Sequence, residues 1–205
     1  ELLAENVEVL GWWDTGYRHV SNNVKPIVEP GDIAGLKMRT LPTKVHVDFF
    51  RALGAQPTPM DWVEVIPALQ QGVIDGQENP AFVMKNFGVT EVQEYYSLTG
   101  HVVEPVLFLG SKMKLTAYSP EVSQVIRDAA KLATEFQREA TSRENTKIMS
   151  ELGAMIEVNE VPAATIEEFR KTAQELYPSV AAEIGGNAPA VVDALERDFG
   201  RLPAQ

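Results

Sequence analysis

An arginine stands at the end of an apolar segment, where it could bind an anion. Residues 36–41 have the character of a β-strand, residues 43–53 have helical spacing, and Arg39 lies just before the turn that joins them. In an open α/β sheet, ligands bind beyond the carboxyl ends of the strands. A guanidinium there presents a planar pair of donors to a carboxylate. The alternative is a structural arginine that pairs with one of the 29 acidic residues, and composition alone favours it.

A second polar residue follows another buried segment. Asn79 precedes Pro80, which favours an extended backbone at residue 79. The amide of Asn79 could therefore project from a strand end as both donor and acceptor. Ordinary turn chemistry at Asp75-Gly76 and at Asn79-Pro80 explains the same residues, so both interpretations stay open at this point.

The strands that would position these residues are short and apolar. We expect them at 7–11, 36–41, 72–75, 105–111 and 154–158, alternating with helical patterns. Several of them have almost no polar alternation, which predicts strands buried on both faces. The fold class is therefore α/β with a mainly parallel sheet.

Four helical regions separate and follow these strands. The first covers 43–53, with Thr43 as its cap and Gly54 after its end. The second covers 64–71, with Pro67 in its first turn, where a missing amide proton does no harm. A long amphipathic helix is predicted from residue 120 to about residue 153. Two or three helices then fill 163–199, interrupted at Pro178 and at 185–187.

Composition excludes several classes of function. A net charge of -11 and a pI near 4.8 disfavour nucleic acid and anionic lipid as partners. The absence of cysteine excludes disulfides, a thiolate nucleophile and cysteine-bound zinc. His19, His46 and His101 lack metal-ligand spacing, and no nucleotide-binding or nucleophile motif is present, so we expect no metal and no cofactor. We also expect neither a transmembrane helix nor a signal peptide in this chain.

Four sequence blocks, in this order and spacing, indicate a family. "GLKMR", "ALGAQPTPMDWVEV", "ALQQGVIDGQENP" and "LTGHVVEPVLFLGS" closely resemble the solute-binding proteins of tripartite ATP-independent periplasmic (TRAP) transporters, of the dicarboxylate-binding (DctP) type. The resemblance extends from about residue 7 to residue 153. It implies a periplasmic protein, not an enzyme, with two α/β lobes around a cleft. Such proteins close on an organic acid and deliver it to a sodium-driven membrane permease.

The resemblance also implies which residues bind the ligand. Arg39 ends the "GLKxR" block and would grip the ligand carboxylate, while Asn79 of "GQEN" would orient the acid. Trp62 would form a wall of the pocket. A second family arginine falls on Arg18 in "GYRHVSNN". The full set of implied ligand-binding residues is Arg39, Asn79, Trp62, Arg18, Trp13 and Trp12, with either Trp12 or Trp13 lining the cleft.

The same resemblance divides the chain into lobes. Residues 1–16 and 105–144 would form the remainder of lobe I, residues 17–104 and 145–205 would form lobe II, and the long helix would span both. Proteins of this family carry a further part of the first lobe at the amino end, which we expect this chain to lack. Open sheet edges would then favour self-association.

Two other functions are compatible with the same two-lobe architecture. One is a ligand sensor, which would carry a fused signalling module. The other is an enzyme, which would need a general base in the cleft, and Glu78 and Asp14 are the candidates.

Overall fold

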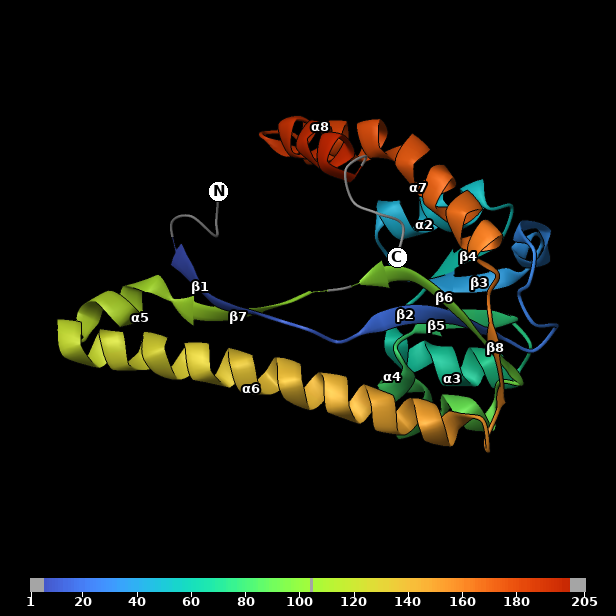
Figure 1. Cartoon of the computed structure of the whole chain (residues 1–205), viewed down its shortest axis with the longest axis horizontal. Coiled ribbons are helices and arrows are strands. Elements are labelled where there is room, and N and C mark those ends of the chain that lie inside the picture. Colours follow the sequence, from blue (N-terminus) through green and yellow to red (C-terminus); the bar gives the residue numbers. More distant parts are fainter. Residues whose placement is uncertain (1–5, 104, 200–205) are drawn as a thin grey trace.

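Two β-sheets and the helices around them make up the part of the chain that the structure describes. The computed structural model describes residues 6–103 and 105–199. The larger sheet has six strands in the order β4-β3-β5-β2-β6-β8, and the smaller pairs β1 with β7 (Figure 1). The strands are β1 (Val7–Trp13), β2 (Tyr17–Asn22), β3 (Lys37–Thr40), β4 (Gln56–Pro59), β5 (Gly76–Asn79), β6 (Tyr95–Val103), β7 (Val106–Ser111) and β8 (Glu157–Glu160).

Helices connect these strands and follow the last of them. The α-helices are α2 (Lys44–Ala52), α3 (Trp62–Gln70), α4 (Ala81–Asn86), α5 (Lys112–Ala117), α6 (Pro120–Leu152), α7 (Ala163–Ile184) and α8 (Ala188–Phe199), with short 3-10 turns η1 (Pro30–Ile33) and η2 (Val89–Glu91). Among the described residues, no helix combines the length and hydrophobicity that a membrane crossing requires.

The larger sheet is mainly parallel, as predicted, with one exception in its middle. β4, β3 and β5 pair in parallel, and so do β6 and β8. β2 lies between β5 and β6 and is antiparallel to both. This reversal brings the beginning of β2 to the same edge of the sheet as the carboxyl ends of β5 and β6. The small sheet is antiparallel.

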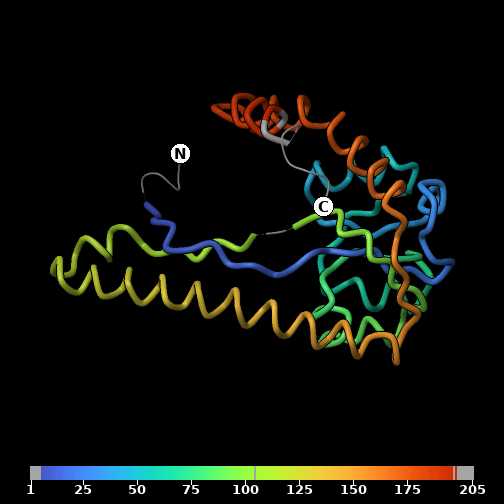
Figure 2. The backbone as a smooth tube through the Cα atoms, viewed as in Figure 1, coloured from blue at the N-terminus to red at the C-terminus, as the bar shows by residue number. Residues whose placement is uncertain are grey.

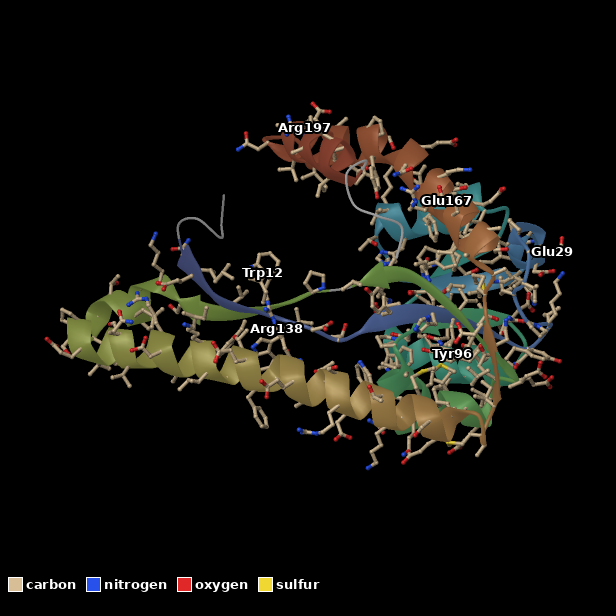
Figure 3. The ribbon with its side chains drawn as sticks, viewed as in Figure 1. Trp12, Glu29, Tyr96, Arg138, Glu167 and Arg197 are labelled. Carbon is tan, nitrogen blue, oxygen red and sulfur yellow. The ribbon has the colours of Figure 1, made fainter. Side chains whose placement is uncertain are left out.

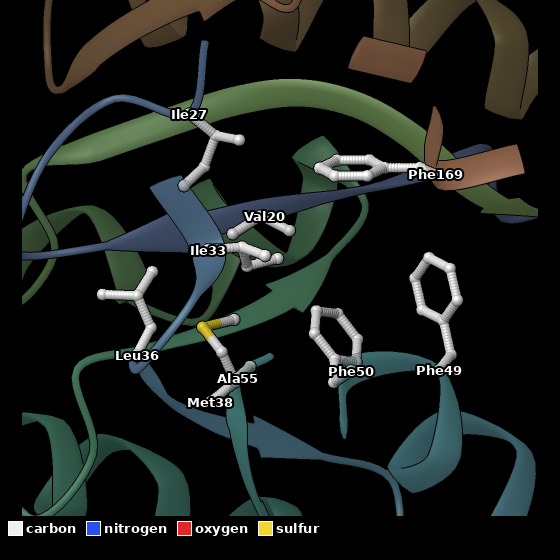
Figure 4. Packing of buried hydrophobic residues seen from close by; sticks show 9 residues of the cluster. All are labelled: Val20, Ile27, Ile33, Leu36, Met38, Phe49, Phe50, Ala55 and Phe169. Atoms are coloured by element: carbon white, nitrogen blue, oxygen red, sulfur yellow. The ribbon is translucent and has the colours of Figure 1, made fainter. Parts of the chain in front are cut away.

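Helices cover both faces of the larger sheet, and each face has its own core. On the α2 and α7 side, Phe50 and Phe169 pack with Val20 and Met38 of the sheet (Figure 4). On the α3 and α4 side, Tyr96 packs among residues of α4 and of the last turns of α6. Successive residues of a strand point to opposite faces, so Val20 and Met38 face the core on the α2 and α7 side, whereas their neighbours in β2 and β3 face the α3 and α4 side.

α6 joins the two sheets. Its 33 residues would span about 50 Å at the standard rise of an α-helix. Near its beginning Arg127 pairs with Glu8 of β1 at 2.6 Å, and near its end Glu151 pairs with Lys85 of α4. The chain also passes between the two sheets before β2 and after β6, as Figure 2 shows. The predicted long helix is confirmed, including its start after Ser119, whose hydroxyl accepts a bond from the amide of Val122.

Several predicted boundaries are wrong. Residues 72–75 form a turn, and β5 begins at Gly76 instead. β8 begins three residues later than the predicted start at 154. β2, β4 and β6 were not predicted, because β2 and β6 are rich in polar residues and β4 contains two prolines. β4 tolerates these prolines because it is an outermost strand, with a neighbouring strand on one side only, so fewer of its backbone amides are needed as donors.

Both predictions that relied on proline are wrong as well. α3 begins at Trp62, so Pro67 lies in its interior and not in its first turn. α7 continues through Pro178 up to Ile184. The helix predicted at 43–53 is confirmed within a residue at each end, and Gly54 after it has the left-handed backbone expected there, with φ of 82°. Thr43 occupies the cap position, although its hydroxyl pairs with His46 Nδ1 at 2.7 Å.

The backbones of β5 and β2 pack closely at Gly76, and this packing gives a first testable prediction. A Cβ at Gly76 would lie 2.2 Å from the carbonyl oxygen of Ser21 on β2, which is far inside contact distance. We expect Gly76→Ala to lower the free energy of unfolding by about 1–3 kcal/mol, the usual range for overpacking, as measured by urea unfolding. Gly153→Ala is the control, since a Cβ there would meet nothing within 4 Å and the backbone is helical. Equal effects of the two substitutions would contradict this packing.

Burial of His19 generates a second prediction. His19 Nδ1 accepts a bond from the amide of Gly100 at 2.9 Å, which requires the neutral ring. Burial, reinforced by repulsion from His101, lowers the pKa of His19 from 6.5 to about 4. Between pH 6.5 and 4, His19 therefore binds a proton in the unfolded chain but stays neutral in the folded chain. Stability should fall by about 3 kcal/mol as the pH is lowered through this window.

His19→Asn tests this effect, because its Oδ1 can accept the Gly100 bond but does not titrate. Urea unfolding at a series of pH values should show a smaller loss of stability between pH 6.5 and 4 in His19→Asn than in the wild type. Parallel curves for the two proteins would contradict the assignment.

Candidate functional site

One edge of the larger sheet gathers most of the residues predicted to bind a ligand. His19 of β2 lies opposite Asn79 at the end of β5, and Tyr17 lies opposite Val103 at the end of β6. This edge faces the small sheet in Figure 1. Arg39 stands next to the last residue of β3. The predicted residues of the larger sheet therefore converge on one edge, as the rule for ligand sites in α/β sheets expects.

Arg39 is buried and held in a fixed orientation. Its guanidinium donates through Nε and Nη2 to the carbonyl oxygen of Met60, at 3.1 and 2.8 Å. The guanidinium carbon also lies 5.8 Å from the ring centroid of Trp62, within the range of a cation–π interaction. The ring of Trp62 is supported in turn by an edge contact with Phe87, at 5.8 Å between centroids. These contacts orient the cation through a neutral carbonyl and an aromatic ring.

Asn79 lies on the same face of the sheet as Arg39. Met38 pairs with Gly76 in register, which places Arg39 beside Gln77 and gives Arg39, Gln77 and Asn79 a common face. The side-chain amide of Asn79 donates through Nδ2 to Gln77 Oε1, and the backbone carbonyl oxygen of Asn79 accepts a bond from the Tyr96 hydroxyl at 3.0 Å. Asn79 is only 7% exposed. Its side chain is therefore ordered by the sheet before any ligand binds.

Arg18 forms a different kind of contact. Its Nε and Nη2 donate to the two carboxylate oxygens of Glu78, at 2.6 and 2.8 Å, and Nη2 also reaches the carbonyl oxygen of Glu78 at 2.7 Å. Both side chains are almost completely buried. Arg18 is therefore already engaged with a carboxylate, whereas Arg39 donates to the neutral carbonyl oxygen of Met60.

His101 completes this buried cluster on the α2 side of the sheet. Its Nε2 lies 3.4 Å from Glu78 Oε2, and its Nδ1 lies 2.8 Å from the Thr99 hydroxyl. Its ring stacks parallel to Phe49, at 5.8 Å between centroids. Burial alone would raise the pKa of Glu78, but His101 and Arg18 outweigh it, and the pKa lies at about 2. Glu78 is thus an ionised carboxylate that accepts hydrogen bonds from Arg18 and lies beside His101.

The two tryptophans of β1 point in opposite directions. Trp13 Nε1 donates to the Thr134 hydroxyl of α6 at 3.3 Å, and its ring packs against Phe108 at 5.1 Å. Trp12 is 52% exposed and lies on the face of the small sheet away from α6 (Figure 3). The structure thus brings Arg39, Asn79 and Trp62 together, places Arg18 behind them with Glu78, and places Trp12 and Trp13 on the other sheet.

A cavity of about 280 Å³ lies between α2, α7 and the end of β6. Its lining includes Val45, Phe49, His101, Val102, Leu176 and Val180. This cavity was not predicted from the sequence. Glu78 was expected only as a candidate base, and its pairing with Arg18 was missed, although a carboxylate in a buried strand requires a cationic partner and could have prompted a search for one.

The described residues contain no group of three or more histidine, aspartate or glutamate side chains suited to a metal ion. The face that carries Arg39 presents instead a guanidinium and the side-chain amides of Gln77 and Asn79. Such an arrangement can bind and orient an anion.

The chain is similar to several known periplasmic binding proteins. The 2,3-diketo-L-gulonate-binding periplasmic protein YiaO of Escherichia coli is 35% identical over 148 residues, which cover 72% of this chain and 45% of that protein. A solved TRAP periplasmic solute-binding protein from Ochrobactrum anthropi aligns with a TM-score of 0.87 and 32% identity, over 98% of this chain and 64% of that one. The sugar acid binding protein of Advenella mimigardefordensis, in complex with galactonate, aligns with a TM-score of 0.84 and 32% identity, over 96% and 64% of the two chains.

The chain spans about half the length of the curated relatives that it matches. The model of the family described as bacterial extracellular solute-binding protein, family 7 (DctP), matches residues 1–184. Because this match covers most of the chain, including both sheets and α6, the chain belongs to family 7 of the bacterial extracellular solute-binding proteins.

Proposed function

We propose that the complete gene product is the periplasmic solute-binding subunit of a TRAP transporter. It would capture a small organic acid in a cleft and deliver it to the membrane permease subunits. The observation that carries this proposal is Arg39, a buried guanidinium at the carboxyl end of a strand, oriented by the Met60 carbonyl and by Trp62.

Each residue at the sheet edge would have a distinct role. Arg39 binds the ligand carboxylate, because a preoriented guanidinium loses little freedom when it forms charge-assisted hydrogen bonds. Asn79, fixed by Gln77, supplies an amide to the same group. Trp62 forms an apolar wall beside the carboxylate. Arg18 contributes through its pair with Glu78, which holds the beginning of β2 against the end of β5.

The two sheets would be the cores of two lobes. Residues 1–16 and 105–144 contain the small sheet and most of α6, and residues 17–104 and 145–205 contain the larger sheet. The exposed ring of Trp12 would face the cleft, whereas Trp13 is engaged with α6. The antiparallel pair β1 and β7 presents exposed apolar side chains, such as Val9 and Leu109, which would also favour the predicted self-association of this chain by itself.

The ligands of relatives support an acid as the substrate. The Escherichia coli relative is named for 2,3-diketo-L-gulonate, and solved relatives contain galactonate, D-erythronate and β-D-galacturonate. A binding function without catalysis also fits Glu78, which is paired with Arg18 and is therefore poorly placed to act as a general base. The other candidate base is Asp14. Its carboxylate oxygen Oδ1 is already occupied by a hydrogen bond from the backbone amide of Gly16, at 2.7 Å.

Substitution of Arg39 tests the proposal. In the complete gene product, Arg39→Ala should weaken the binding of the organic acid that the wild type binds most tightly, chosen from a panel that includes galactonate and D-erythronate, by about 2–5 kcal/mol, since a buried carboxylate would lose its charged partner. Arg39→Lys should restore only part of the affinity, because lysine keeps the charge but loses the planar pair of donors. Calorimetric titration gives the dissociation constants, and melting temperatures measured alongside report any loss of folding.

The matched control is Arg51→Ala, which removes an exposed arginine paired with Asp48 on α2. It should leave the dissociation constant unchanged. If Arg39→Ala also bound that acid with wild-type affinity, Arg39 would be a structural residue and the proposed role would be wrong.

A further inference from the structure

The cavity between α2, α7 and β6 lies next to the proposed acid site. Val102, in its lining, is opposite Arg18 in the β2–β6 register, and His101, also in its lining, is 3.4 Å from Glu78. Glu78 and Asn79 are consecutive residues, so their Cα atoms are about 3.8 Å apart. Because Glu78 and Asn79 point to opposite faces of β5, the cavity and Arg39 lie at the same end of the sheet but on opposite faces of it.

The chain that follows Arg39 also leads to the cavity, through α2. β3 ends at Thr40, one residue after Arg39, and α2 begins at Lys44. Val45 and Phe49, from the first turns of α2, then line the cavity. A ligand lying over the edge of the sheet could thus contact Arg39 at one end and the cavity at the other.

The lining selects for an apolar group. Val45, Phe49, Leu176 and Val180 offer no hydrogen-bond partners to a ligand, and His101 presents its ring in a parallel stack with Phe49. His46 and Tyr177 also line the cavity, so its wall is mainly but not wholly apolar. Ligand hydroxyls buried against such side chains would lose their bonds to water without replacement. The volume of about 280 Å³ exceeds that of cavities known to hold a benzene molecule, which are of the order of 150 Å³.

We infer that the organic acid bound by this protein carries an apolar or aromatic body, which occupies the cavity between α2, α7 and β6 while its carboxylate is held at Arg39. This inference rests on the proposed function and narrows its substrate class. It sets this chain apart from relatives solved with polyhydroxylated acids such as galactonate.

Two acids that differ only in a ring test the inference. In the complete gene product, 3-phenylpropanoate should bind about tenfold or more tightly than propanoate, the gain expected for burying a phenyl group. It should also bind more tightly than galactonate. The dissociation constants come from calorimetric titration.

Filling the cavity should remove this preference. Ala173 of α7 lines the cavity, so Ala173→Phe should bring the affinity for 3-phenylpropanoate down to that for propanoate while propanoate binding persists. Ala182→Phe, at an exposed position of the same helix, is the control and should keep the wild-type ratio. The wild-type ratio is decisive by itself if Ala173→Phe fails to fold.

The possible failures are distinguishable. If galactonate binds more tightly than 3-phenylpropanoate and Arg39→Ala abolishes that binding, the proposed function stands and the apolar body is refuted. If 3-phenylpropanoate binds tightly but Ala173→Phe leaves its affinity unchanged, the cavity is not its site and the inference is refuted. If neither 3-phenylpropanoate nor propanoate binds, the inference is refuted, whereas the proposed function falls only if Arg39→Ala leaves the affinity for a bound acid unchanged.

Discussion

Two guanidinium groups are buried at one edge of the larger sheet, and the arrangement around them follows from the need to satisfy them. A buried cation is strongly unfavourable unless acceptors are placed within hydrogen-bond distance. Arg18 receives the Glu78 carboxylate from β5, and Arg39 receives the Met60 carbonyl from the segment between β4 and α3. Loss of one partner from a buried pair typically costs about 3–5 kcal/mol. These bonds hold β2 against β5, and β3 against the segment that leads into α3.

The reversed strand β2 is the element that makes this arrangement possible. It is polar, yet it lies in the middle of the sheet, and its buried polar side chains are hydrogen-bonded, either to neighbouring strands or to nearby loops. Ser21, for example, donates to Gln93 and accepts a bond from Gln77. Because β2 enters from the small sheet, its first residues bring Arg18 directly to the ends of β5 and β6. The same segment joins the site to β1, which packs on α6. A movement of the small sheet relative to the larger sheet would therefore change the position of Arg18.

Apolar spacing, helix caps and glycines in the sequence correctly predicted one strand and two helices of the fold. The apolar segment before Arg39, the helix with Gly54 after its end and the long helix after Ser119 all formed as expected. β2 and β6 were missed because their polar residues are satisfied by partners distant in sequence. Pro178 did not end α7, which shows that packing of the helix can override a local breaker.

The site could be predicted only in part for the same reason. Arg39 and Asn79 stand at recognisable strand ends, and family blocks identified both. The partner of Arg18 is 60 residues away, and no local pattern reports which face of a sheet each arginine occupies. The cavity depends on α2 and α7, which lie more than a hundred residues apart in the chain. Such features follow from tertiary packing, and a single sequence does not display them.

The central claim is that Arg39 binds the ligand carboxylate while Arg18 stays with Glu78. The most direct measurement is a crystal structure of the complete gene product with whichever of galactonate, D-erythronate and 3-phenylpropanoate binds most tightly. The account predicts a carboxylate oxygen at about 2.7–3.2 Å from the Arg39 guanidinium, with both bonds between Arg18 and Glu78 retained. A carboxylate held by Arg18 in place of Glu78, or bound away from Arg39, would contradict it.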